Sequence, residues 1–364
     1  MKKNTFIFIC FLLLAPTLTN GMQDSSDNIG IVEEEHENLI ASCLKDLEEL
    51  GYCVIPQLLS ASETESLYQR VWHEFIEKAW PECRMDDRSN WKEEFPMHNK
   101  WGLFAGPAGQ TQVMWDLRQD PRIVNVFAKV WNTNDLIVSM DGLSFMSPSE
   151  IREGYIEPWP HVDQKILRRQ DGFAHNNCPP IGFVSESQLK TQPYTIQGQF
   201  LFEDSFEGDA GFYCIPKSHL RFSEFALELP DKGEVEYLQD FFAHNTDEFG
   251  EPYCMKHIIA PRGSLILWDS RTVHWNQHAS KSDNPKVRMV GYLCYVPKVR
   301  LTEEGMMLRI SAFTNGVSTG HNPAYSELKY TKDHIDQEFK RYLEDPSYTQ
   351  PEIILTPLGK SLLG

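Results

Sequence analysis

The sequence predicts an α+β fold, with a jelly-roll core of β-strands and helical decoration at the N-terminal and C-terminal ends. Apolar residues recur at helical spacing in the first third of the chain, and six short strand-like runs follow from about residue 135. Helical spacing returns in residues 332–343, where Ile335, Phe339 and Leu343 recur. Helices first and many short strands afterwards indicate a β-rich core, and two facing sheets of eight strands in all fit this pattern.

The N-terminal elements follow one another in a clear order. We expect the polar residues 23–30 to be disordered. Residues 39–47 have the apolar spacing of an amphipathic helix, which Gly51 ends. Residues 52–55 predict a strand, and the capping box at 60–63 begins the next helix.

The middle of the chain changes from helical to strand periodicity. Residues 81–112 contain several Gly, Pro and Trp residues, so we expect an irregular loop that lies over a site. Asp120 and Pro121 begin a further helix, with Pro in its first turn. The predicted strands, which Gly, Pro and Asp separate, are residues 136–140, 194–202, 211–215, 254–259, 264–268 and 287–295. No internal repeat is visible.

The composition restricts the partners of the protein. Its 364 residues suit one large domain, which we place at residues 22–364, with a helical C-terminal extension from residue 298. Acidic residues outnumber basic ones by 52 to 34, which gives a net charge of −18. Phosphate-rich partners prefer the opposite sign, so the charge argues against nucleic acid and against a CoA thioester. Nothing in the sequence indicates an oligomeric state.

Residues 1–21 predict a secretory signal peptide. Lys2 and Lys3 precede ten apolar residues, 6–15, and small residues follow with Thr19 and Gly21 at the usual −3 and −1 positions. The alternatives are a frayed apolar terminus or a short membrane anchor, but ten residues cannot span a bilayer core that needs about 20. We therefore expect a mature protein without stable membrane insertion, secreted or within the secretory or periplasmic compartment.

The cysteines do not form a metal motif. Seven remain after the signal peptide, dispersed and without a C-x-x-C pair, so a zinc ribbon is not supported. An odd number leaves at least one thiol unpaired within the chain, and the sequence does not assign any disulfide. Cys214 and Cys294 lie in apolar runs, where we expect buried free thiols.

Two stretches 113 residues apart carry candidate metal ligands. His161 and Asp163 lie in the first, and His274 lies in the second. The alternation around both histidines predicts strands, on which residues i and i+2 point to the same side. Two imidazoles and one carboxylate form the facial triad of non-haem Fe(II) oxygenases, which leaves coordination positions open. Arg288, 14 residues after His274, has the charged fork that a dicarboxylate co-substrate needs.

A His-x-acid pair by itself is weak evidence. With 12 His and 52 Asp+Glu in 364 residues, chance alone gives between one and two such pairs. The second pair, His334 and Asp336, lies in the helical stretch 332–343, where residues i and i+2 point to different faces. His278 competes with His274, since it lies on the same face if the strand continues, but His274 directly follows the strand 264–268. His175, His244 and His257 have no identifiable partner.

Several motifs together resemble the phytanoyl-CoA dioxygenase family of Fe(II)/2-oxoglutarate oxygenases. The resemblance covers about residues 50–297, in the order and approximate spacing of the family. The matching motifs are GYCVIP at 51–56, WDLRQDP at 115–121, His161-Val-Asp163, GFYCIPKSH at 211–219, GSLILWD at 263–269, and His274 with Arg288. The resemblance implies a double-stranded β-helix (jelly roll), iron, 2-oxoglutarate and molecular oxygen.

The resemblance also assigns roles to individual residues. His161, Asp163 and His274 would bind the iron, and Arg288 would bind the distal carboxylate of 2-oxoglutarate. Gln199 falls near a family position that lines the co-substrate, although a slip of one residue would substitute its neighbour. Asn276 lies one strand period beyond His274, so it faces the same side and is also expected to bind 2-oxoglutarate. Lys100 and Gln197 are weaker candidates for contact with the co-substrate. His219, in a Pro-x-Ser-His turn signature, is expected to be structural.

The implied reaction converts 2-oxoglutarate and O2 to succinate and CO2 while it hydroxylates a small molecule or an exposed side chain. Residues 81–112 and 163–191 would act as lids that exclude water. A non-catalytic jelly-roll binding protein is the main alternative. A zinc hydrolase built on His274 and His278 lacks the Glu of H-E-x-x-H. A halogenase would need a small residue in place of Asp163.

Overall fold

The structure is a computed structural model, and it describes residues 25–89, 91, 102–148, 158–164, 194–228, 233–247, 249–280, 286–325 and 352–364. The chain divides into two compact units, Met1–Leu39 and Ile40–Gly364. The predicted signal peptide and the predicted helix at 332–343 lie outside the described residues. None of the helices in the described part of the chain has the length and apolarity that a membrane span requires.

Helix α1 (Ser25–Leu50) begins earlier than the apolar pattern indicates. The prediction of disorder for residues 23–30 is therefore wrong from Ser25 onward. A helix gains one hydrogen bond for each residue that it adds, so it can extend through a polar stretch without apolar periodicity. Gly51, with a φ of +80°, directly follows the helix as predicted.

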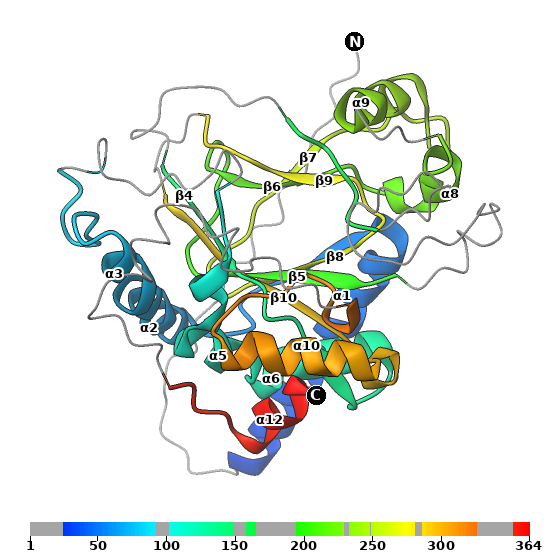
Figure 1. Ribbon diagram of the computed structural model, residues 1–364. Coiled ribbons are helices and arrows are strands. Elements are labelled where there is room, and N and C mark those ends of the chain that lie inside the picture. The colour runs from blue at the N-terminus through cyan, green and yellow to red at the C-terminus, as the bar shows by residue number, and fades with distance from the viewer. Residues whose placement is uncertain are drawn as a thin grey trace, which may run out of the picture. The chain divides into compact units, whose positions relative to one another are not determined.

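The second unit contains two antiparallel sheets (Figure 1). The larger has seven strands in the order β1-β8-β5-β10-β4-β2, with β3 paired to β10, and the smaller has the order β7-β6-β9. The strands are β1 (Tyr52–Ile55), β2 (Leu103–Phe104), β3 (Leu136–Val138), β4 (Leu143–Met146), β5 (Ile196–Leu201), β6 (Gly211–Cys214), β7 (Lys256–Ile258), β8 (Leu265–Asp269), β9 (His274–Gln277) and β10 (Arg288–Pro297).

The six strands predicted from residue 135 onward, the strand at 52–55 and the strand around His274 are present, and so is the expected mixture of helix and antiparallel sheet. The strand predicted around His161 is wrong, since His161 forms only a single β-bridge with His274. Strands β2 and β4 have no counterpart among the predicted strands. β2 has two residues, which is too few to show any period. All four residues of β4 are buried, and Phe145 and Met146 are adjacent apolar residues, so this short strand has no regular alternation.

The helices begin where the capping signals indicate. The Ser60 side chain accepts a hydrogen bond from the Glu63 N–H, and the Glu63 carboxylate accepts one from the Ser60 N–H. This capping box begins α2 (Ala61–Val71), which continues as a π-helical turn and α3 (Glu77–Ala79). Asp120 caps α6 (Pro121–Trp131) by accepting a hydrogen bond from the Arg122 N–H.

Three helices have no counterpart among the predicted elements: α5 (Gln112–Arg118), α8 (Phe222–Phe225) and α9 (Glu234–His244). Two more, α10 (Glu303–Thr314) and α12 (Pro357–Leu363), lie in the helical extension predicted from residue 298, although their bounds were not predicted. In α10 the buried residues include Gly305 and Arg309, whereas Met307 and Ile310 are exposed. A helix that buries polar and small residues shows no apolar stripe in its sequence. Within 81–112, the expected loop is interrupted by β2 and by a 3-10 helix (Gly106–Gln110).

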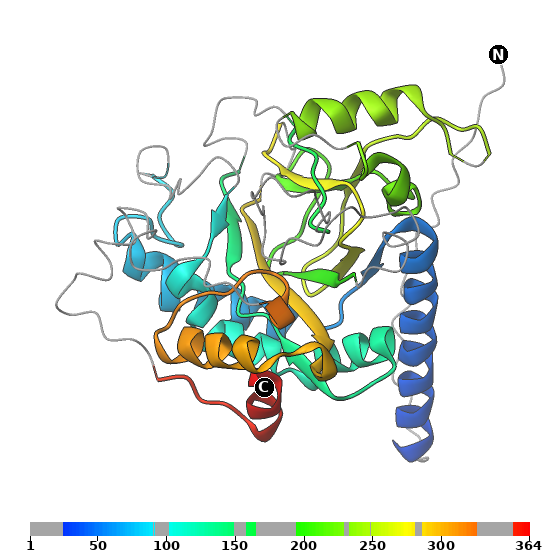
Figure 2. The same ribbon diagram turned by 45° about the vertical axis from the view of Figure 1, so that its right-hand side comes forward.

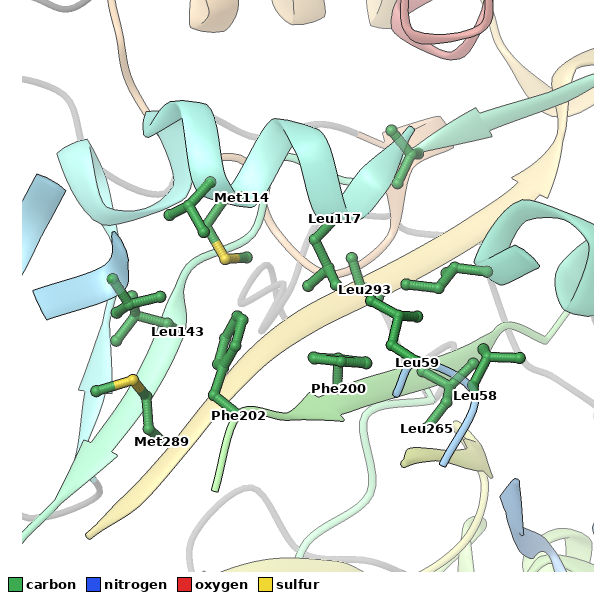
Figure 3. Packing of buried hydrophobic residues seen from close by; sticks show 14 of the residues in the cluster. Leu58, Leu59, Met114, Leu117, Leu143, Phe200, Phe202, Leu265, Met289 and Leu293 are labelled. Atoms are coloured by element: carbon green, nitrogen blue, oxygen red, sulfur yellow. The ribbon is translucent and has the colours of Figure 1, made fainter. Parts of the chain in front are cut away.

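The large sheet is packed on both faces. Figures 1 and 2 show the small sheet on one side of it and helices α5, α6 and α10 on the other. On the helix side, Met114 and Leu117 of α5 pack with Phe200 of β5 and Leu293 of β10 (Figure 3). Successive side chains of a strand point to opposite faces. The residues that directly precede and follow Phe200 and Leu293 in these strands therefore point toward the small sheet.

Between the sheets lies a second core. Ile266, Trp268 and Val290 of the large sheet pack there with Phe212 and Cys214 of the small sheet. The two sheets thus enclose a space whose walls come from strand residues of both. Cys214 and Cys294 are buried free thiols, as predicted.

A C-terminal segment, residues 316–325, is tied to the core by hydrogen bonds. Ser318 Oγ donates to the Gly106 carbonyl over 2.7 Å, and Gln110 Nε2 donates to the Val317 carbonyl over 2.9 Å. Thr319 exchanges two hydrogen bonds with Met140, each of 2.9 Å. Ser318 and Thr319 are fully buried, so this segment forms part of the folded unit although it lies beyond the resemblance to the family.

Replacing Gly142 with alanine is expected to destabilise the protein. A Cβ at this position would lie 1.7 Å from the Phe104 carbonyl oxygen, so strands β2 and β4 would have to separate. Overpacking of this kind costs about 1–3 kcal/mol. Urea unfolding of Gly142→Ala should show this loss. Gly250→Ala serves as a control, because an added Cβ there meets no atom and introduces only the strain of a φ of +80°. An unchanged unfolding midpoint for Gly142→Ala would contradict the close approach.

Candidate functional site

The two histidine segments pair directly with each other. His161 and His274 form an isolated antiparallel bridge, with N–H to carbonyl distances of 3.1 and 3.0 Å in the two directions. His274 begins β9, as the alternation predicts. His161, in contrast, forms this single bridge and is not part of any described strand. The Gln164 N–H donates to the Ser270 carbonyl over 2.7 Å, which fixes the other end of the first segment. Backbone pairing therefore brings together ligands that are 113 residues apart in the sequence.

Both imidazoles are oriented in the same way. His161 Nδ1 lies 3.1 Å from the Trp159 carbonyl oxygen, and His274 Nδ1 lies 2.9 Å from the Thr272 carbonyl oxygen. Because a carbonyl oxygen only accepts, each Nδ1 carries a proton in this contact, which leaves Nε2 as the ring nitrogen that faces a metal. The His161 ring also stacks on Trp159, with ring centroids 4.5 Å apart and planes at 2°.

Asp163 completes a compact group of three potential ligands. His274 Nε2 lies 3.3 Å from Asp163 Oδ2, and His161 Nε2 lies 3.8 Å from Asp163 Oδ1. One ligand atom from each of the three residues lies within 4.8 Å of the others. Within the described part of the chain this is the group that could hold a metal ion, and the buried His278 is outside it.

The surroundings favour the protonation states that bind metals. Burial, together with the neighbouring His274, lowers the pKa of His161 to about 4. Burial raises the pKa of the Asp163 carboxyl, but the imidazoles of His321, His274 and His161 outweigh it and hold that pKa well below its usual range. At neutral pH, His161 is therefore neutral and Asp163 is ionised, as a metal ligand must be.

Arg288 lies in a buried polar group next to the candidate ligands. Its Nη2 donates to Gln199 Oε1 over 2.7 Å and to Asn276 Oδ1 over 2.8 Å, and Asn276 Nδ2 donates to the Tyr292 hydroxyl over 2.9 Å. Gln199, Arg288 and Asn276 are no more than 8% exposed. Among the described residues, Arg288 Nη1 is buried without a hydrogen-bond partner. A buried guanidinium N–H of this kind is a natural donor to an anionic ligand.

A cavity of about 420 Å³ includes His161, Asp163 and His274 in its wall. Its volume lies in the range of small-molecule sites. The apolar part of the wall includes Leu103, Phe104, Leu143, Trp159, Phe212 and Leu293. The polar part includes Asn276 and Tyr292, whereas Arg288 and Gln199 line a separate, much smaller cavity. Tyr292 and Asn276 thus lie at the boundary between the cavity and the arginine.

The structure brings together most of the residues that the sequence indicated and adds others. Gln197 belongs to the cavity wall, where its Nε2 donates to Asp163 Oδ2 over 3.0 Å. The sequence contained a signal for this position, since Gln197 lies two residues before Gln199 and residues i and i+2 of a strand point to the same face. Lys100 and His175 lie outside the described residues. The expected lid at 163–191 also lies outside them from residue 165 onward. His321 also lines the cavity. It lies beyond the resemblance, so no motif could indicate it.

Three further histidines, His219, His244 and His278, are not among the candidate metal ligands. His219 Nε2 lies 3.0 Å from the Glu48 carbonyl oxygen at the end of α1, which agrees with its predicted structural role. His244 is exposed and lies 3.1 Å from Asp240 one helical turn away. The zinc-hydrolase reading of His274 and His278 required a helix, but His274 lies on β9. That alternative is therefore wrong.

His257 is expected to make stability depend on pH. Its ring stacks on Tyr213 at 4.5 Å, and burial, then the charge of Arg288, lower its pKa to about 4. The unfolded chain takes up this proton near pH 6.5, so the unfolded state binds more protons between these two values. The stability that neutral His257 contributes is fully present above about pH 6.5, and the free energy of unfolding falls by ~3 kcal/mol as the pH decreases toward 4. Urea unfolding at pH 7 and pH 4.5 should show a smaller difference for His257→Phe than for the wild type. Equal differences would contradict this prediction.

Comparison with known proteins shows distant relatives. No protein-family model matches the chain. The chain is 26% identical over 283 residues to "Ava biosynthesis cluster protein O" of Aspergillus versicolor, a match that covers 74% of this chain and 82% of that protein. It is 21% identical over 255 residues to "Putative phytanoyl-CoA dioxygenase" of Dictyostelium discoideum, covering 66% of this chain and 71% of that protein. The resemblance to phytanoyl-CoA dioxygenases is thereby confirmed.

Two solved structures overlap loosely with this chain. The "non-heme alpha ketoglutarate dependent carbocyclase SnoK" has a TM-score of 0.45 and 19% identity, over 71% of this chain and 85% of that one. HygX from Streptomyces hygroscopicus "with nickel and 2-oxoglutarate bound" has a TM-score of 0.42 and 15% identity, over 72% of this chain and 88% of that one. Overlaps at this level are too loose to transfer a function.

Proposed function

We propose that the protein is an Fe(II)- and 2-oxoglutarate-dependent dioxygenase that hydroxylates a small molecule or an exposed side chain. The observation that carries this proposal is the group of His161, Asp163 and His274 at the wall of a cavity of about 420 Å³. The buried Arg288 close to that wall supports a carboxylate co-substrate. The relative named as a phytanoyl-CoA dioxygenase supports the same chemistry.

The donor set suits iron. Two neutral imidazoles and one carboxylate are the protein ligands of the facial triad, which leaves further positions for a co-substrate. His161, Asp163 and His274 would hold the metal through Nε2, a carboxylate oxygen and Nε2. When bound, Fe(II) supplies the activation of O2 that couples the decarboxylation of 2-oxoglutarate to C–H oxidation. The two carbonyl contacts of the Nδ1 atoms keep the imidazoles in the orientation that this set requires.

The other residues of the site bind and orient the co-substrate. Arg288 would receive the distal carboxylate in a bidentate pair, and Gln199 and Asn276 would hold the guanidinium in place. The apolar wall, including Phe104 and Leu143, would exclude water from the reacting atoms. We further propose that the two facing sheets form the double-stranded β-helix of this enzyme class.

We also propose that residues 1–21 direct export and that the mature protein begins near Met22. The charge and apolar run of this segment support the proposal. Export would separate the enzyme from acyl-CoA, an intracellular metabolite, and the net charge of −18 also disfavours a CoA ester. A small molecule is the favoured substrate, since the Aspergillus relative is named as a biosynthesis cluster protein. N-terminal sequencing that finds an intact Met1 on cytosolic protein would contradict export.

The function has a direct test. Purified protein with Fe(II) and O2 is expected to convert 2-oxoglutarate to succinate, and a metabolite library should contain compounds that raise this rate and gain one oxygen atom. The measurement is succinate formation together with mass spectrometry of the library. Metal-loaded protein that binds library compounds without forming succinate would instead support the non-catalytic jelly-roll binding protein.

The reaction is expected to end in hydroxylation and not in halogenation. Asp163 supplies a carboxylate at the position where halogenating relatives have a small residue, and its negative charge disfavours a halide next to the metal. Product from an assay in chloride buffer should therefore contain no chlorine by mass spectrometry. Asp163→Gly should abolish hydroxylation, with loss of iron as the expected cause. A chlorinated product from the wild type would overturn the hydroxylase assignment.

A further inference from the structure

Two glutamines on one strand contact two different parts of the site. Gln197 and Gln199 lie on β5, two residues apart, with Gly198 between them on the helix-facing side. Both amides are buried, with 2% and 1% exposure. Nothing about residue type or burial distinguishes them, so the difference between them comes from the neighbouring strands.

Gln199 belongs with the arginine. Its Oε1 accepts a hydrogen bond of 2.7 Å from Arg288 Nη2. In the register of the sheet, Gln199 is paired with Tyr292 of β10, the strand that Arg288 begins. Tyr292 in turn accepts a hydrogen bond from Asn276, the second partner of Arg288.

Gln197 belongs with the carboxylate. Its Nε2 donates to Asp163 Oδ2 over 3.0 Å, and it lines the same cavity as the three candidate ligands. A carboxylate only accepts, so the NH2 end of the amide must face Asp163. Within the described part of the chain, Gln197 Oε1 is buried without a partner. The contact with Asp163 is therefore what orients this amide.

Asp163 needs an external support of this kind. It lies in the short segment 158–164, in which the backbone pairs with the sheet at His161 and at Gln164 but not at Asp163 itself. Strand β5, in contrast, is hydrogen-bonded on both edges, to β8 and to β10. The amide of Gln197 therefore links the carboxylate to a central strand of the large sheet.

We propose that Gln197 is a positioning residue for the metal ligand Asp163, and that β5 divides its two glutamines between metal binding and co-substrate binding. Gln197 supports the metal site through Asp163, and Gln199 supports the 2-oxoglutarate site through Arg288. This inference rests on the proposed function, since it assumes a metal at Asp163 and a carboxylate at Arg288. Hydrogen-bonding partners of metal ligands typically change metal affinity by about 10–100-fold when they are removed.

The test compares Gln197→Leu with the matched control Gln199→Leu. Both replacements have similar volume, remove one buried amide and lie on the same face of β5. Co(II) is titrated into each metal-free protein and followed by its visible absorption, and 2-oxoglutarate is then titrated calorimetrically into the Co(II)-saturated protein. We expect Gln197→Leu to weaken Co(II) binding by about 10–100-fold and to leave 2-oxoglutarate binding unchanged. Gln199→Leu should leave Co(II) binding unchanged and weaken 2-oxoglutarate binding about tenfold.

A second variant, Gln197→Glu, tests the contact without a change in volume. A carboxylate at 197 would face the Asp163 carboxylate, and two like charges at this distance share a proton. Metal-free Gln197→Glu should take up one more proton than the wild type near neutral pH, and its Co(II) affinity should rise more steeply with pH. This variant keeps the test decisive if Gln197→Leu does not fold.

The outcomes distinguish a failure of the proposed function from a failure of the role assigned to Gln197. If the wild type binds neither Co(II) nor Fe(II), the proposed function is wrong. If the wild type binds Co(II) while Gln197→Leu binds it equally well, or Gln197→Glu shows the pH dependence of the wild type, the role of Gln197 is wrong. Equal losses of both affinities in both glutamine variants would show a general structural effect and would also overturn the division of roles.

Discussion

Replacing His161 or His274 with alanine is expected to remove iron from the protein and to abolish succinate formation. Each variant deletes one of two imidazoles whose Nε2 atoms lie within 3.8 Å of Asp163, so one ligand of three is lost. This effect should exceed the 10–100-fold that changes around a metal ligand typically cause. Iron content by elemental analysis and succinate formation from 2-oxoglutarate are the two measurements.

The chain offers a matched control in His278→Ala. His278 is also a buried imidazole, four residues after His274, but it is not part of the group that could hold a metal. Its replacement should leave the iron content unchanged. If His161→Ala and His274→Ala both keep the iron content and turnover of the wild type, the ligand assignment is wrong.

Replacing Arg288 with alanine is expected to weaken 2-oxoglutarate binding and to leave metal binding intact. Arg288 is 5% exposed, and its Nη1 has no partner among the described residues, so a carboxylate bound there would be buried against it. Leaving such a charge without its partner costs about 2–5 kcal/mol, which corresponds to a loss of affinity of roughly 30-fold or more. Calorimetric titration of 2-oxoglutarate into Co(II)-loaded protein measures the change.

Arg271→Ala serves as the control for a lost arginine. Arg271 lies three residues before His274, but its guanidinium is paired with Asp269 and stacks on Tyr194 at 4.2 Å. Its loss should reduce stability without a change in 2-oxoglutarate affinity. An unchanged affinity in Arg288→Ala would move the carboxylate contact to another cation, and Lys100 would be the first to replace.

The candidate metal ligands and Arg288 could be found from the sequence because their signals are short motifs that follow one another in a fixed order along the chain. The i and i+2 spacing of His161 and Asp163 is informative wherever the chain is extended, and the interval from His274 to Arg288 spans one strand and its connection. The capping signals at Ser60 and Asp120 were equally local, and both helices begin there. The face to which a side chain points and the residue at which a helix begins depend on neighbouring residues, so both can be predicted without knowing the distant contacts.

Other features depended on contacts that the sequence does not display. Helix α10 buries Arg309, which donates hydrogen bonds to the Leu362 and Leu363 carbonyls, so its buried face is not its apolar face. His321 reaches the cavity because Thr319 pairs with Met140, which precedes it by 179 residues. Neither arrangement has a period that a sequence could reveal.

The sequence by itself determined most of the strands, the candidate ligand types and their order along the chain, because each depends on residue chemistry and on a period of two. Only the tertiary structure decided which of two similar glutamines faces Asp163 and which faces Arg288. Both side chains point to the same face of β5, so periodicity cannot separate them. Strand register does separate them, since β10 places Tyr292 opposite Gln199 and Cys294 opposite Gln197. Register is a property of paired strands, and it exists only when the chain has folded.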